Sequence, residues 1–208
     1  MNASSTTSSF AVVLTAAGES TRMDQPKQLL EWHGVPLIQY QVRQLLSTSA
    51  DEIVVVLGRE AERLRPLVAE AQDSRIRVIV NEDYSDGKAT SIKCGLRPIE
   101  GAPDAVMLLA VDQPRPAPIL ERLVDAHLAG GNLISVPSHR GKHGHPPVFS
   151  GVLLAELQEI TEEGRGLLEV IDRHRAELRE VDIEDAIVLT NINTPEDYDR
   201  ALELLSSE

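Results

Sequence analysis

The sequence predicts an α/β protein with three layers, in which a mostly parallel, twisted sheet lies between helices. Short apolar runs at residues 10–16, 51–58, 75–81, 104–112 and 132–137 are typical of strands that are buried on both faces. Helical patterns at residues 36–46, 60–70, 90–97 and 118–128 alternate with those runs. This alternation favours right-handed crossovers and a doubly wound sheet.

The composition is that of an ordinary globular protein, with 42% hydrophobic and 25% charged residues in a chain of 208. Residues 1–9 are small and polar and predict a disordered leader, followed by a single domain at residues 10–208. A formal net charge of -13 argues against non-specific binding to nucleic acid. Because Cys94 is the single cysteine and no apolar stretch is long enough for a membrane helix, we expect a cytoplasmic protein without a membrane partner.

The pattern changes after residue 137. The segment SHRGKHGHPPVFS predicts a loop or short hairpin over the open edge of the sheet rather than a central strand. Helices are expected at residues 153–160 and 166–175, and short strands at residues 177–183 and 186–190. Thr194 and Pro195 then suit the N-cap and first position of a C-terminal helix.

A loop of small residues, Ala16-Ala17-Gly18, ends the first strand, and two cations, Arg22 and Lys27, follow it. Small side chains let backbone N–H groups approach an anion, and the two cations add fixed positive charge. The loop matches neither of the common phosphate-binding motifs, and a purely structural turn is the alternative. We interpret the segment as a candidate site for the phosphates of a nucleotide.

Two oxygen-bearing side chains are candidates for a cation site. Asp112 ends the fourth strand in LAVDQP, and ligands of such sheets bind beyond the carboxyl ends of the strands. Its carboxylate suits Mg²⁺, although an Asp here can equally cap the next helix. Asn193 precedes the last helix and offers a neutral oxygen ligand, or serves only as a turn residue.

Polar residues in two further segments are candidates for substrate contacts. Asn81 ends the third strand and Ser91 lies in the first turns of the next helix, where they either read a base or ribose or form a plain loop and cap. His145 lies in the tripeptide GHP, in a loop that faces solvent or grips a ligand. Nearby His139 and His143 raise the question of zinc, but no cysteine cluster accompanies them.

Taken in order, these segments resemble the MobA-like nucleotidyltransferases. The chain reads TAAGESTRMDQPKQLL, VNEDYSDGKATSIKCGL, AVDQP, GHP and NINTPED where the family has LAAGxSxRMGxxKxLL, VxN…GxxxSxxxGL, LxDQP, GHP and D/N-x-D/N-TPED. The resemblance extends from Val12 to the C-terminal helix and looks most like the molybdenum cofactor cytidylyltransferase branch. It implies a Rossmann-like nucleotidyltransferase fold and transfer of a nucleotidyl group from a nucleoside triphosphate, with release of pyrophosphate.

For the nucleotide, the resemblance implies that Ala16, Ala17 and Gly18 contact it and that Arg22 and Lys27 hold its β- and γ-phosphates. In this family LAAG tends to accompany CTP, and LAGG tends to accompany GTP. The methyl group of Ala17 narrows the space beside the base, which a purine would feel more than a pyrimidine. CTP is therefore the expected donor, and GTP is the alternative.

For the rest of the site, the resemblance implies that Asn81 and Ser91 lie near base and ribose and that His145 lines the acceptor side. It also implies that Asp112, a catalytic residue with the two cations, binds Mg²⁺ and that Asn193 is the second ligand. The expected acceptor is a small phosphate, with molybdopterin favoured and an apo-molybdoenzyme as a further candidate partner.

Four positions depart from the family pattern, namely Asp24, Lys88, His143 and Gly166. Asp24 puts a carboxylate near the phosphate loop, whereas the other three cluster on the acceptor side. The departures leave the transfer core intact but keep two alternatives open. One is an enzyme for another phosphate such as a sugar phosphate, and the other is a non-enzymatic module that delivers a cofactor.

Overall fold

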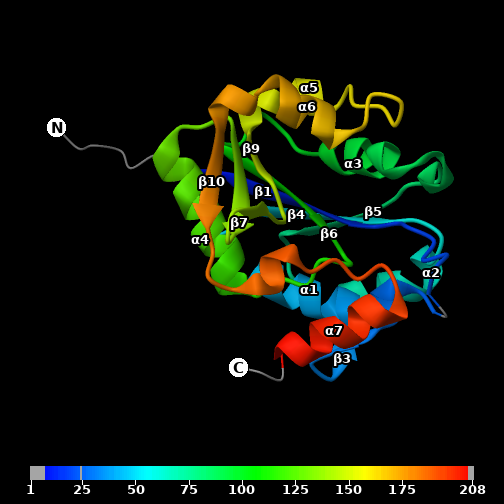
Figure 1. The fold of residues 1–208 in the computed structure, drawn as a ribbon. Helices are drawn as coiled ribbons and strands as arrows, with labels where there is room; N and C mark the ends of the chain where they lie inside the picture. The colour runs from blue at the N-terminus through cyan, green and yellow to red at the C-terminus, as the bar shows by residue number, and fades with distance from the viewer. Residues whose placement is uncertain (1–7, 24, 206–208) are drawn as a thin grey trace.

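The computed structural model describes residues 8–23 and 25–205, which form a three-layer α/β fold (Figure 1). The strands of the main sheet are β1 (Phe10–Ala16), β4 (Glu52–Leu57), β5 (Ile76–Val80), β6 (Ala105–Ala110), β7 (Ile134–His139), β8 (Lys142–His143), β9 (Val148–Ser150) and β10 (Leu178–Asp182). Their order is β10-β7-β9-β6-β1-β4-β5, and β8 pairs with β7. Strands β2 (Glu31–Trp32) and β3 (Val35–Pro36) form a separate hairpin.

Most neighbouring strands run parallel, as predicted, and β9 is the exception inside the sheet. It pairs antiparallel with both β6 and β7, and its residues Val148 and Phe149 are fully buried. The prediction that residues 138–150 contain no central strand is therefore wrong for their last three residues, whereas the predicted hairpin is present as β7 and β8. A three-residue strand is too short to show a period, and the two prolines before it suggested a loop.

Helices cover both faces of the sheet (Figure 1). One face carries α1 (Leu37–Leu46), α2 (Ala61–Ala69), α4 (Ala117–Gly130) and α7 (Pro195–Leu205), and the other carries α3 (Lys88–Leu96), α5 (Leu154–Leu157) and α6 (Leu167–Arg173). Each face has its own apolar core, because successive β1 residues alternate, with Val12 and Leu14 on the first side and Ala11 and Val13 on the second. Among the helices of the described residues, none has the length and apolarity needed to cross a membrane.

The segment at residues 186–190 is not the predicted strand but a 3₁₀ turn, Ala186–Leu189. The carboxylate of Asp185 accepts a hydrogen bond from the backbone N–H of Ile187 at 2.8 Å and so caps the turn. The carbonyls of Val188 and Thr190 are taken by the side chain of Arg115 rather than by a strand. The apolar composition of this segment predicted a strand, but side chains rather than a neighbouring strand satisfy its backbone groups.

The topology brings the carboxyl ends of β1, β4, β5 and β6 to one edge of the sheet, since these four strands are parallel. The chain returns to this edge just before α7. There Thr194 forms the predicted cap: its Oγ1 accepts from the N–H of Asp197 at 3.2 Å, while its own N–H donates to the Asp197 carboxylate at 3.0 Å. This reciprocal pair fixes the backbone beside Asn193.

Candidate active site

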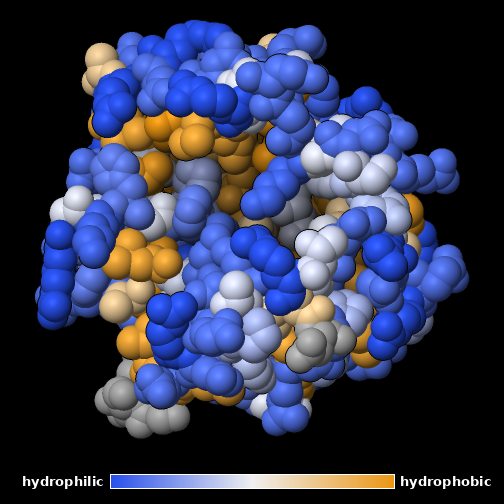
Figure 2. Space-filling view, turned by 45° about the vertical axis from the view of Figure 1, so that its right-hand side comes forward, coloured by the Kyte–Doolittle hydropathy of each residue, from blue (hydrophilic) through white to orange (hydrophobic). Residues whose placement is uncertain are grey.

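A cavity of about 840 Å³ opens at this edge, a volume typical of small-molecule sites. The space-filling view shows the hollow, with a hydrophilic rim and hydrophobic surface gathered in its upper part (Figure 2). The end of β1, the loop after it, the start of α3, the end of β6, the GHP segment and the start of α6 all contribute to its walls. Of the residues predicted from the sequence, the following line it: Ala17, Gly18, Arg22, Lys27, Ser91, Asp112, His145 and Asn193.

Three of the predicted residues meet at one point of the cavity wall. The Lys27 ammonium lies 3.0 Å from Asp112 Oδ2 and 2.9 Å from Asn193 Oδ1. The side chains of Lys27 and Asp112 are only 12% and 15% exposed, so this ion pair is partly shielded from solvent. The exposed Arg22 also donates to Asn193 Oδ1, at 3.3 Å. The folded chain thus gathers cations and oxygen ligands from three distant segments.

The loop after β1 is braced by polar contacts that the sequence did not reveal. Gln28 is buried, and its Nε2 donates to the carbonyls of Ala16 and Gly18 at 2.8 and 3.1 Å. The hydroxyl of Ser20 accepts the backbone N–H of Lys27 at 2.9 Å. These bonds hold a small-residue loop open toward the cavity. Ala16 is buried and lies outside the cavity lining, whereas Ala17 and Gly18 border the cavity.

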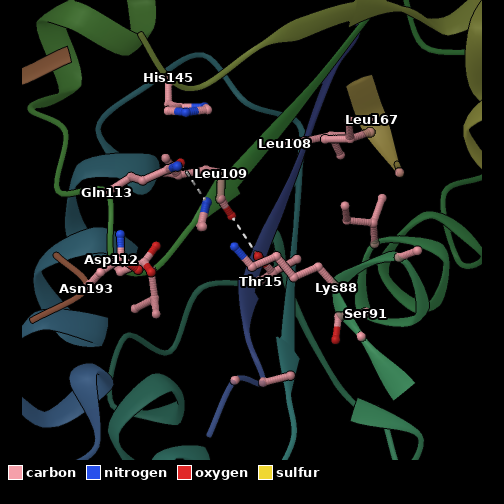
Figure 3. A pocket seen from close by; sticks show the side chains of 18 of the residues that line it. Thr15, Lys88, Ser91, Leu108, Leu109, Asp112, Gln113, His145, Leu167 and Asn193 are labelled. Carbon is pink, nitrogen blue, oxygen red and sulfur yellow. Dashed lines mark hydrogen bonds between the residues drawn. The ribbon is translucent and has the colours of Figure 1, made fainter. Parts of the chain in front are cut away.

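Asn81 and Ser91 form a connected pair on the other side of the cavity. The buried Asn81 donates through Nδ2 to the hydroxyls of Thr90 and Ser91, at 2.9 and 3.0 Å. Ser91 borders the cavity, whereas Asn81 lies behind it and orients it. Figure 3 shows Ser91 on one side of the view and Asp112 with Asn193 on the other.

His145 lies at the upper end of the cavity in Figure 3. Partial burial lowers the pKa of its ring below the usual value, and the positive charge of Arg115 acts in the same direction. Leu108 and Leu167 lie on the other side of the same view (Figure 3) and make that part of the cavity wall apolar. The other two histidines of this segment have partners of their own. His139 pairs with the carbonyl of Ile183, and His143 pairs with the carboxylate of Glu180.

Three of the four departures from the family pattern line the same cavity, and Lys88 lies near Ser91 in Figure 3. Lys88 begins α3 and Gly166 precedes α6 with a φ of 58°, and both line the cavity together with His143. Glu162 accepts the backbone N–H of Ala89 and so spans from the loop before α6 to the first turn of α3. Asp24 lies outside the described residues.

The turn after Asp112 contains two polar braces that sequence reasoning missed. Gln41, fully buried on α1, donates to the carbonyl of Gln113 at 2.7 Å and accepts the N–H of Arg115 at 3.3 Å. Arg115 is also fully buried, and this burial lowers the pKa of its guanidinium to about 9, against the opposing effect of the Asp112 carboxylate. Both residues act on backbone groups far away in the sequence, so no local motif marks them.

The donor set at Asp112 fits a divalent cation. Asp112 Oδ2 and Asn193 Oδ1 both lie within 3.0 Å of the Lys27 ammonium, so the two oxygens already converge on one positive charge. Mg²⁺ prefers oxygen ligands and is commonly held by one or two carboxylates together with substrate phosphates. No cluster of three or more His, Cys, Asp or Glu side chains that could hold a metal occurs among the described residues.

The fold, with a cavity at the carboxyl ends of its parallel strands, is that of an α/β nucleotidyltransferase. The chain belongs to the MobA-like NTP transferase domain family, whose model matches residues 11–180.

Similar proteins agree with this assignment. The molybdenum cofactor cytidylyltransferase of Escherichia coli is 28% identical over 199 residues, which cover 94% of this chain and 97% of that protein. The bifunctional protein GlmU of Kineococcus radiotolerans is 34% identical, but the match covers 61% of this chain and only 26% of GlmU. The crystal structure of Rv0371c from Mycobacterium tuberculosis has a TM-score of 0.81 and 28% identity over 95% of this chain and 99% of that one. Rv0371c has also been crystallised as a manganese complex, with a TM-score of 0.75, 26% identity and coverage of 95% and 99%.

Proposed function

We propose that this nucleotidyltransferase transfers CMP from CTP to the phosphate of molybdopterin and releases pyrophosphate. The observation that carries the proposal is the convergence of Lys27, Asp112 and Asn193 at one wall of the cavity. A cation and two oxygen ligands at that point suit a triphosphate that arrives with a divalent metal. The likeness to the Escherichia coli cytidylyltransferase over nearly the whole of both chains supports the choice of substrates.

In the proposed reaction, an oxygen of the acceptor phosphate attacks the α-phosphorus of CTP, and the bond to the β-phosphate oxygen breaks. The attacking oxygen is already anionic near neutral pH, so no general base is required. Lys27 and Arg22 bind the β- and γ-phosphates and neutralise charge as pyrophosphate leaves. A metal bound by Asp112 and Asn193 would supply further charge neutralisation at the phosphates.

The two sides of the cavity suit the two substrates. Ala17, Gly18 and Ser91 form the proposed nucleotide side, and the methyl group of Ala17 favours a pyrimidine over a purine. His145 and the apolar residues near Leu167 form the proposed acceptor side. An apolar wall supports a ring-bearing acceptor over a sugar phosphate, because each sugar hydroxyl needs a hydrogen-bonding partner when it is buried.

A thermal-shift panel of CTP, GTP, UTP and ATP, each with Mg²⁺, tests the donor. We expect CTP to raise the melting temperature more than the other three. A selective shift with GTP would overturn the choice of base, and the absence of a shift with any of the four would favour a non-enzymatic delivery module. Pyrophosphate release with molybdopterin, compared with sugar phosphates, then tests the acceptor.

A further inference from the structure

Arg115 joins three separate segments of the chain through backbone carbonyls. Its Nε donates to the carbonyl of His145 at 2.8 Å, and one terminal nitrogen donates to its neighbour Pro114 at 2.8 Å. The other terminal nitrogen donates to the carbonyls of Val188 and Thr190 at 2.8 and 2.9 Å. Arg115 is 0% exposed, so its donor nitrogens are shielded from water, and the bonds to Pro114 and Val188 are fully buried.

Each of the three segments carries a residue of the proposed site. Asp112 lies three positions before Arg115, His145 is bonded directly, and Asn193 lies three positions after Thr190. Backbone bonds complete the junction, because the N–H of Ile192 donates to the carbonyl of Asp112 at 2.8 Å.

We infer that Arg115 is a positioning residue that fixes the loop of the GHP tripeptide (the acceptor loop) and the Asn193 segment relative to Asp112. The inference rests on the proposed function, in which these parts hold the acceptor and the metal. The loop after β1, which forms part of the proposed nucleotide side, is braced separately by Gln28. Loss of the Arg115 geometry should therefore impair metal and acceptor binding while leaving contacts to the nucleotide itself intact.

The substitution Arg115→Lys tests this, because lysine keeps the positive charge but lacks the planar fork that reaches several carbonyls. We expect the Mn²⁺ affinity of the enzyme–CTP complex, measured by electron paramagnetic resonance, to fall about tenfold. The acceptor KM should rise to a similar extent. The Kd of CTP measured in EDTA should stay within about twofold of the wild-type value, as expected for a selective loss of positioning.

Arg75→Lys is the matched control. Arg75 also donates to three backbone carbonyls, those of Leu46, Thr48 and Ala50, but it precedes β5 at the opposite edge of the sheet. This variant should lower the melting temperature and leave the metal and acceptor constants unchanged.

A second variant perturbs the same junction without touching Arg115. A β-carbon on Gly144 would collide with the carbonyl oxygen of Val188, so Gly144→Ala should push the acceptor loop away and reproduce the Arg115→Lys constants. Unchanged metal and acceptor constants in Arg115→Lys, with only a lower melting temperature, would overturn the inference. If the wild-type protein prefers a nucleotide other than CTP, the proposed donor fails, and the same comparison with the preferred nucleotide still decides the role of Arg115.

Discussion

The Lys27 ammonium has one set of partners in the free protein and another in the proposed reaction. In the free protein it bridges Asp112 and Asn193, the two oxygen donors that suit a divalent metal. In the proposed reaction the same ammonium binds the departing phosphates. A metal at the proposed site would therefore compete with Lys27 for Asp112 until a nucleotide offers Lys27 new anionic partners.

This competition predicts that Lys27→Met changes two measurements in opposite directions. Without nucleotide, Mn²⁺ affinity should rise about tenfold, because the competing ammonium is gone. With Mg²⁺ and CTP, turnover measured by pyrophosphate release should fall about 10²–10³-fold, because a preorganised charge at the leaving group is lost. Lys93→Met, a change on α3 outside the cavity lining, should alter neither value. An unchanged Mn²⁺ affinity in Lys27→Met would contradict the competition.

The predictability of site residues depends on where their partners lie. Lys27 and Asp112 could be predicted as candidates because each lies in a recognisable polar segment that follows a buried strand, and the structure brings them together. Gln28 and Arg115 were not, because their partners are backbone carbonyls brought close only by folding. Gln and Arg are usually exposed, so it is the burial of these two side chains that indicates a structural role. Burial can be seen only in the folded chain.

At the scale of elements, contact between the ends of β1 and β4 shapes the loop after β1. A β-carbon on Gly58, which follows β4, would lie 2.6 Å from the carbonyl oxygen of Ala17. One on Gly18 would have no atom within 4 Å. The two glycines therefore have different roles. Gly58 allows the two backbones to approach closely, and Gly18 leaves space in the cavity.

Alanine at each position should separate these roles. Gly58→Ala should lower the free energy of unfolding by about 1–3 kcal/mol, because the added carbon strains the loop. Gly18→Ala should leave that free energy within about 0.5 kcal/mol of wild type. It should nevertheless weaken CTP binding, because its methyl group takes space meant for the nucleotide. Chemical denaturation and calorimetric titration measure the two effects, and wild-type CTP affinity in Gly18→Ala would exclude this loop from the nucleotide site.

The contact between α4 and β7 has a pH dependence of its own. Burial lowers the pKa of His127 to about 4, and its ring pairs with the hydroxyl of Ser135 at 2.9 Å. Between pH 6.5, the usual pKa of histidine, and pH 4, His127 binds a proton in the unfolded chain but stays neutral in the folded chain. Stability should therefore fall by about 3 kcal/mol between pH 6.5 and pH 4 from this group. Urea denaturation should show a flatter profile for His127→Asn, and parallel profiles would refute the assignment.

The fold was predictable from the sequence wherever an element was long enough to show a period. The parallel strands and the helices α1, α2, α3 and α4 each follow from apolar runs and amphipathic spacing. The errors fall on the short strand β9 and on residues 186–190, and α5 is shorter than the predicted helix at residues 153–160. In these segments tertiary partners, rather than local pattern, determine the backbone conformation.

At the scale of the whole molecule, helices cover both faces of the sheet, and the cavity lies at the edge formed by the carboxyl ends of the parallel strands. The formal net charge of -13 disfavours anionic ligands over most of the surface. Arg22, Lys27 and Lys88 supply positive charge locally, at the cavity. This local positive charge is what the proposed binding of a triphosphate requires in a chain whose overall charge is negative.

The most direct test is a product analysis with all donors in competition. The wild-type protein is incubated with molybdopterin, Mg²⁺ and equal concentrations of CTP, GTP, ATP and UTP, and the products are identified by mass spectrometry. We predict a CMP adduct of molybdopterin, with one pyrophosphate released for each adduct. A GMP adduct, or no adduct despite nucleotide binding, would contradict the proposed cytidylyl transfer.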